Sequence, residues 1–164
     1  MALLETEKLS FYYPGEKRRS LNEVSFSVEE GEFIVVCGSS GSGKSTLLRL
    51  LKREIAPHGR QEGEIRYKGK NIDHVEPIQR AKEIGILFQD PENQIVMERV
   101  LEELAFGLEN IGLSTDQMRT KIAEMAHYFG IHPLMEEKIH HLSGGQKQIV
   151  NLASILLMEP SLLL

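Results

Sequence analysis

The sequence predicts an α/β fold with a mixed or parallel core sheet, an antiparallel β edge and an inserted helical subdomain. Residues 33–37 form an unbroken apolar run bounded by glycines, which is typical of a strand buried on both faces of a parallel sheet. Val24, Phe26 and Val28 alternate with polar residues, which predicts a half-buried strand at an antiparallel edge. From residue 96 to about residue 142, apolar residues recur at helical spacing, and this stretch predicts the helical subdomain.

Length and composition favour one soluble globular domain. The chain has 164 residues, of which 41% are hydrophobic and 26% are charged, so it has enough apolar residues for a core and too many for disorder. A net charge of -5 argues against nucleic-acid binding. Glu5 and Glu7 stand where a signal peptide needs basic and then apolar residues, and no run is long enough for a membrane span, so we expect a cytoplasmic protein. The single cysteine, Cys37, is predicted to be a small core residue of the buried strand.

The remaining elements follow from local patterns. Residues 45–52 predict a helix, and residues 64–72 predict a hairpin that turns at Lys68-Gly69-Lys70-Asn71. Residues 84–88 are a second short apolar run, which Gln89-Asp90-Pro91 ends. A last helix begins near Ser143 and ends at Glu159-Pro160, and residues 162–164 begin another strand.

A phosphate-binding loop is predicted at residues 38–45, which read GSSGSGKS and match the pattern G-x-x-x-x-G-K-[ST] between a strand and a helix. Glycines let backbone amides point toward phosphate oxygens at a helix N-terminus. Lys44 can then reach the β and γ phosphates, Ser45 can hold Mg2+, and Thr46 can add a donor. The residues expected to bind nucleotide here are Gly38, Ser39, Gly41, Ser42, Gly43, Lys44, Ser45 and Thr46. The alternative is a Gly/Ser-rich loop with an accidental lysine, and the loop alone does not separate kinases, GTPases, motors and transporter ATPases.

A second glycine-rich segment, Leu142-Ser143-Gly144-Gly145-Gln146, stands at the start of the last predicted helix. A hydroxyl and glycine amides at a helix N-terminus form a second anion cradle. Together with the following Lys-Gln, this LSGGQ segment resembles the signature of ABC transporter ATP-binding proteins. The resemblance implies a P-loop NTPase of the ABC type that works as a dimer, in which Ser143, Gly144, Gly145 and Gln146 act on the γ phosphate held by the partner subunit. The alternative is that Ser143 only caps a helix.

The same resemblance gives roles to two further side chains. Gln89 stands where the family has the glutamine that contacts Mg2+ and the attacking water, so Lys44 and Gln89 are the expected catalytic residues, and Ser45 and Gln89 the expected metal-binding ones. Tyr13 stands where the family has the aromatic ring that stacks on adenine. Packing at a strand edge is the other reading of Tyr13, and Tyr12 is the alternative stacking residue. The sequence departs from the family at Ile149, where an arginine is usual.

Residues 89–95 (QDPENQI) and 100–112 (VLEELAFGLENIG) are similar to the ATPases of energy-coupling factor importers, which take up vitamins and transition-metal ions. The expected partners are therefore ATP, a second ABC ATPase subunit in a homo- or heterodimer, and a transmembrane coupling subunit on the inner face of the membrane. Gln94 and its neighbours would shape the groove for a coupling helix. The alternatives are a soluble ABC ATPase without a transport role and a nucleotide-binding module without turnover.

The resemblance also implies how the domain is divided. Residues 1–89 would form a RecA-like core with its antiparallel part, about 90–142 the helical subdomain, and 143–164 the signature helix and the start of the Walker B strand. The family has an aspartate, a glutamate and a histidine beyond the position of Leu164. We therefore expect a partial domain, incomplete at the C-terminus, that binds ATP with little hydrolysis. The histidines show no spacing that indicates a metal site.

Overall fold

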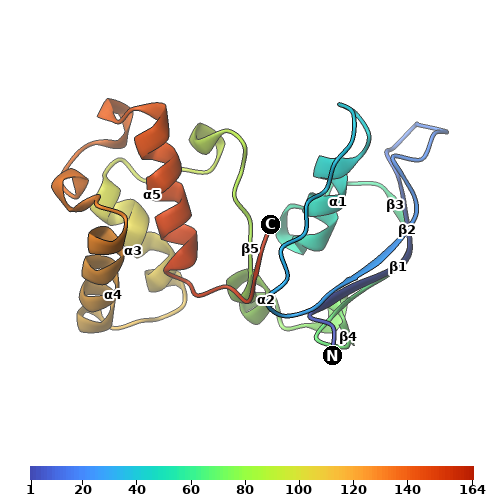
Figure 1. Cartoon of the computed structure of the whole chain (residues 1–164), viewed down its shortest axis with the longest axis horizontal. Coiled ribbons are helices and arrows are strands. Elements are labelled where there is room, and N and C mark those ends of the chain that lie inside the picture. The colour runs from blue at the N-terminus through green and yellow to red at the C-terminus, as the bar shows by residue number, and fades with distance from the viewer. The chain divides into compact units, whose positions relative to one another are not determined.

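A computed structural model describes residues 1–164, and these divide into two compact units, Met1–Ala81 and Lys82–Leu164. Figure 1 labels helices and strands of both units. The division into three segments expected from the sequence stays a prediction.

The first unit contains a four-stranded antiparallel sheet with the order β2-β1-β3-β4. Its strands are β1 (Leu4–Tyr12), β2 (Leu21–Val28), β3 (Arg60–Tyr67) and β4 (Lys70–Asn71). The β3–β4 hairpin turns at Lys68 and Gly69 as the sequence predicts, and the alternating residues expected at 24–28 lie in β2. The predicted antiparallel part of the fold is therefore confirmed.

The helices of this unit begin directly after the glycine-rich loop. Helix α1 spans Lys44–Leu51, with Leu47, Leu50 and Leu51 buried on its inner face. Two short 3-10 turns follow, Arg53–Ile55 (η1) and Ile72–His74 (η2), and α2 (Pro77–Glu83) crosses the boundary between the units. The predicted helix at 45–52 is confirmed to within a residue at each end.

The strand expected at residues 33–37 does not form. The segment has no regular secondary structure, Phe33 is 92% exposed and Val35 66% exposed, and Cys37 is exposed as well. The expectation of a buried strand and a core cysteine was therefore wrong for this structure. The reason is that an apolar run becomes a strand only when neighbouring strands take its amide and carbonyl groups, and β1 to β4 pair only with one another.

The second unit packs three helices around one apolar core. Helices α3 (Val100–Asn110), α4 (Thr115–Tyr128) and α5 (Gly144–Leu156) lie side by side in Figure 1 and all contribute to the core. The buried residues of the core are Val100, Leu104, Leu108, Ile122, Ala126, Ile131, Ile139, Leu142, Val150, Ala153 and Leu157. The 3-10 turn Pro91–Asn93 (η3) lies between β5 and α3, and the turns His132–Leu134 (η4) and Ile139–His141 (η5) lie between α4 and α5. The predicted helical subdomain is present.

Two short strands, β5 (Ile84–Gly85) and β6 (Leu162–Leu163), pair in parallel. Hydrogen bonds between Leu87 and Leu164 (2.9 Å) and between Leu164 and Gly85 (3.0 Å) continue this pairing. The apolar run at 84–88 and the last residues of the chain therefore do meet as strands, which the sequence predicted separately. No helix in the structure combines the length and apolar character that crossing a lipid bilayer requires.

Candidate functional site

The glycine-rich loop owes its course to two glycines with positive φ, Gly41 (76°) and Gly43 (95°). Gly43 is the N-cap of α1, and a Cβ atom added there would lie 2.4 Å from the carbonyl oxygen of Ser20. No other residue type fits this position without a shift of the backbone. The residue just before β2 therefore approaches the start of α1 so closely that position 43 requires glycine.

The side chain of Lys44 folds back over this loop. Its Nζ donates to the carbonyl oxygens of Gly38 and Ser39, both at 2.8 Å. Ser45 is exposed and its hydroxyl makes no hydrogen bond within the protein, and no acidic residue lies in the first turn of α1. The first amides of a helix have no intrahelical acceptor, so the ammonium, these amides and the Ser45 hydroxyl form a concentration of donors that fits a phosphate group.

Tyr13 lies beside the same helix. Its hydroxyl is hydrogen-bonded to that of the buried Thr46 (3.0 Å), and its ring packs edge-on against Phe11 with centroids 5.1 Å apart. Tyr12 is engaged elsewhere: Arg19 Nε donates to its hydroxyl, and the guanidinium groups of Arg19 and Arg60 lie within 6 Å of its ring. Of the two aromatic rings considered for adenine, Tyr13 is the one tied to the phosphate-loop helix.

The second glycine-rich segment forms the N-terminus of α5. Ser143 is its N-cap and makes a reciprocal capping box with Gln146: Gln146 N donates to Ser143 Oγ (3.3 Å), and Ser143 N donates to Gln146 Oε1 (2.8 Å). Gly144 and Gly145 are exposed, and a Cβ atom added to either would meet nothing within 4 Å. The fold of this chain therefore uses Ser143 as a cap but does not itself require the two glycines.

The segment after β5 carries Gln89, whose side chain is exposed and makes no hydrogen bond within the protein. The amide of Gln94 braces the same segment: its Oε1 accepts from Phe88 N (3.0 Å) and its Nε2 donates to Ile86 O (2.9 Å). The buried carboxylate of Glu103 on α3 accepts from the amides of Val96 and Met97 at 3.0 and 2.9 Å. The side chain of Gln94, which was expected to shape a groove, thus forms hydrogen bonds with the backbone of residues 86 and 88.

Helix α5 also contacts this segment. Lys147 Nζ lies 2.6 Å from Glu92 Oε1, and this hydrogen bond and the nearby positive charge hold the pKa of Glu92 below its usual value. The buried Asn151 donates from Nδ2 to the carbonyl oxygen of Pro91 at 3.1 Å. These contacts were not predicted from the sequence. An asparagine beside the apolar Val150 and Ala153 on the core side of the helix was the signal available.

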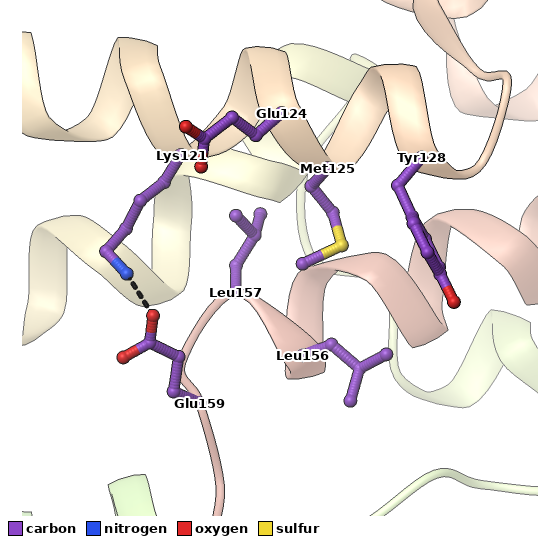
Figure 2. Close-up of a pocket in the computed structure, with 7 residues that line it drawn as sticks. All are labelled: Lys121, Glu124, Met125, Tyr128, Leu156, Leu157 and Glu159. Carbon is purple, nitrogen blue, oxygen red and sulfur yellow. Dashed lines mark hydrogen bonds and ion pairs between the residues drawn. The ribbon is translucent and has the colours of Figure 1, made fainter.

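Two cavities lie in the second unit. One of about 430 Å³ lies between α4 and the end of α5, with Met125, Leu156 and Leu157 on its walls, Tyr128 at its side and the Lys121–Glu159 ion pair on its rim (Figure 2). The other, of about 500 Å³, is a groove beside α3 and α4. Its apolar lining includes Met97, Leu101, Ala105, Met118, Ile122 and Met135, and does not include Gln94. No three or more His, Cys, Asp or Glu side chains come together as a metal site.

The structure thus brings the expected residues together in two groups. The phosphate loop, Lys44, Ser45, Thr46 and Tyr13 lie in the first unit, while Gln89 and the glycine-rich start of α5 lie in the second. A glycine loop with its lysine at the start of a helix defines a nucleotide-binding protein of the P-loop class. A family model described as "ABC transporter" matches residues 21–164, so the chain belongs to the ABC transporter family. The fold is that of ABC-type P-loop NTPases, as the sequence predicts.

Known relatives support the same assignment. The chain is 48% identical over 164 residues to a putative ABC transporter ATP-binding protein of Bacillus cereus, covering all of this chain and 30% of that protein. It is 35% identical to the energy-coupling factor transporter ATP-binding protein EcfA1 of Mycoplasmopsis synoviae, covering 99% of this chain and 60% of that protein. The structure matches that of cbiO1 from Clostridium perfringens, described as part of the ABC transporter complex cbiONQ. The TM-score is 0.85 and the identity 31%, over 99% of this chain and 64% of that one. The chain thus spans less than two thirds of each of these relatives.

Proposed function

We propose that this chain is part of an ATP-binding and ATP-hydrolysing subunit that energises a membrane importer of the energy-coupling factor type. The observation that carries the proposal is the donor-rich start of α1, where the Lys44 ammonium and an unpaired Ser45 hydroxyl lie at a glycine loop. Membership of the ABC transporter family supports ATP with Mg2+ as the nucleotide. Similarity to EcfA1 and cbiO1 supports the importer type, and a vitamin or transition-metal ion as solute.

Different residues of the first unit bind different parts of the nucleotide. The loop amides and Lys44 bind the phosphates, Ser45 ligates Mg2+, and Tyr13 packs against the base. Bound ATP supplies the phosphoanhydride bond whose hydrolysis drives transport. With ATP and Mg2+ bound, Lys44 would stabilise the charge that develops on the transferred phosphoryl group, and Gln89 would orient the attacking water and contact Mg2+.

The start of α5 serves the nucleotide of a second subunit. A glycine in a helix is less favourable than alanine by about 1 kcal/mol, yet neither Gly144 nor Gly145 is needed by the packing of this chain. Two exposed glycines are explained by the close approach of another molecule's atoms to the helix N-terminus. A γ phosphate held by the partner subunit has the charge that this N-terminus attracts.

The membrane subunit is proposed to dock in the groove beside α3 and α4. Met97, three residues after Gln94, is the lining residue nearest in sequence to the Gln89 segment. Methionines such as Met97, Met118 and Met135 adapt to the apolar face of a helix, and Leu101 is 39% exposed. The occupant is an amphipathic helix of the transmembrane coupling subunit, which places the protein on the inner face of the membrane.

Two substitutions in the full-length protein test the nucleotide roles. Lys44→Ala is expected to abolish ATP binding, because it removes the only cation at the loop, whereas Ser143→Ala is expected to leave ATP binding nearly intact and to weaken ATP-driven dimerisation. Binding is measured by titration calorimetry and association by analytical ultracentrifugation. Equal loss of ATP binding in both variants would contradict the proposal that the phosphate loop and the start of α5 bind the nucleotides of different subunits. If the protein binds ATP normally but no membrane subunit stimulates its ATP hydrolysis, an ABC ATPase without a transport role is favoured.

A further inference from the structure

Asn151 is a buried polar residue whose hydrogen bonding is incomplete. It lies in the middle of α5 and is 0% exposed, its Nδ2 donates to the carbonyl oxygen of Pro91, and its Oδ1 has no partner. Burying a carbonyl oxygen without a donor destabilises a fold. Stability alone therefore does not explain an asparagine at this position.

The carbonyl oxygen that Asn151 contacts does not need this bond. Pro91 O already accepts from the backbone amides of Gln94 (3.1 Å) and Ile95 (3.2 Å) in the η3 turn. Removing the Asn151 amide would leave that oxygen satisfied and would also remove the unpaired Oδ1. What the bond does provide is a fixed connection between α5 and the turn that follows Gln89.

A second connection of the same kind lies one helical turn earlier. Lys147 and Asn151 are four residues apart and share one face of α5, and Lys147 pairs with Glu92 in the same turn. The two contacts join residues 91–92 to the helix that begins with the glycine-rich signature. On the N-terminal side of Gln89, the side chain of Gln94 instead forms hydrogen bonds with the backbone of Ile86 and Phe88.

We propose that Asn151, assisted by Lys147, is a positioning residue that fixes the Gln89 segment to α5 and so sets where Gln89 stands relative to the signature. This rests on the proposed function, since it gives Gln89 its role at ATP. Asn151 does not itself contact the nucleotide. Its effect on turnover passes through Gln89.

Asn151→Leu in the full-length protein separates positioning from stability. Leucine has the same number of side-chain heavy atoms, is a better helix former and carries no unpaired oxygen. The midpoint of thermal unfolding is therefore expected to stay the same or rise. Amide hydrogen exchange in residues 91–95 is expected to speed up about fivefold. The kcat for ATP is expected to fall about tenfold with KM unchanged, because the displaced Gln89 no longer orients water.

Ser154→Ala is the matched control, because the Ser154 hydroxyl lies on the same helix and donates only to the backbone oxygen of Asn151. It is expected to change neither exchange in residues 91–95 nor kcat. In a Gln89→Ala background, Asn151→Leu is expected to cause no further loss of kcat. If Asn151→Leu misfolds, Glu92→Gln replaces it, since Glu92 is on the surface, and the same change in exchange and kcat is expected to a smaller degree.

Three results would overturn the proposal: a lower unfolding midpoint that accounts for the loss of activity, unchanged exchange in residues 91–95, or an equal loss of kcat with and without Gln89. Failure of the proposed function is recognised separately. In that case the unsubstituted full-length protein would not hydrolyse ATP, while the exchange measurement would still show whether Asn151 holds the segment.

Discussion

Replacing Gly145 with alanine is expected to stabilise the protein while impairing its ATP-driven association. Gly145 lies in the first turn of α5 with an ordinary helical φ, and an added Cβ would meet no atom within 4 Å. The substitution therefore brings neither strain nor a clash, and the higher helix propensity of alanine adds up to about 1 kcal/mol to the free energy of unfolding. In the proposed dimer, the same methyl group would stand where the partner's γ phosphate approaches the helix amides, so closure of that dimer on ATP is expected to weaken.

The assay compares two quantities for each variant of the full-length protein: the free energy of unfolding from urea titration, and the dimer fraction with and without ATP from analytical ultracentrifugation. Gly43→Ala is the contrasting variant, because φ of 95° costs alanine about 1–2 kcal/mol and its Cβ would lie 2.4 Å from Ser20 O. It is expected to lose stability. The reasoning is refuted if Gly145→Ala destabilises the protein, or if its ATP-driven dimerisation equals that of the unsubstituted protein.

Two further predictions concern the second unit. The pKa of Glu92 is lowered by Lys147, so the pair adds stability above the ordinary pKa of a glutamate and loses it as the pH falls through the lowered pKa. After correction for the pH dependence of the intrinsic exchange rate, protection of the amides of residues 91–95 against hydrogen exchange should therefore fall on acidification, and Glu92→Gln should remove that pH dependence. If the dependence persists in Glu92→Gln, another group is responsible. Leu101→Glu should reduce co-purification with the membrane subunit about tenfold without affecting ATP binding. Tyr128→Glu, which changes an 80% exposed ring beside the other cavity, should leave co-purification unchanged. The opposite result would move the docking surface to the cavity of Figure 2.

The parts of the site that could be predicted are those in which neighbouring residues determine the geometry. The phosphate loop and the Ser143 cap depend on glycines, a lysine and a serine within a few positions of a helix start, and the structure has helices beginning at Lys44 and Gly144. The family was likewise evident from these two segments. The role of Gln94 was less accessible, because a glutamine in the segment after a short apolar run gives no indication that its amide will bind backbone at residues 86 and 88.

The sequence by itself determined that the chain carries a phosphate-loop motif and an LSGGQ segment, because both are local patterns that place amides and side chains wherever the helix begins. Only the tertiary structure decided that the apolar run at 33–37 stays unpaired here, since pairing needs other strands and not only suitable residues. It also decided that Asn151 meets Pro91, which is 60 residues away in the chain. A contact at that separation follows from how α3, α4 and α5 pack around their core, and no spacing along the sequence encodes it.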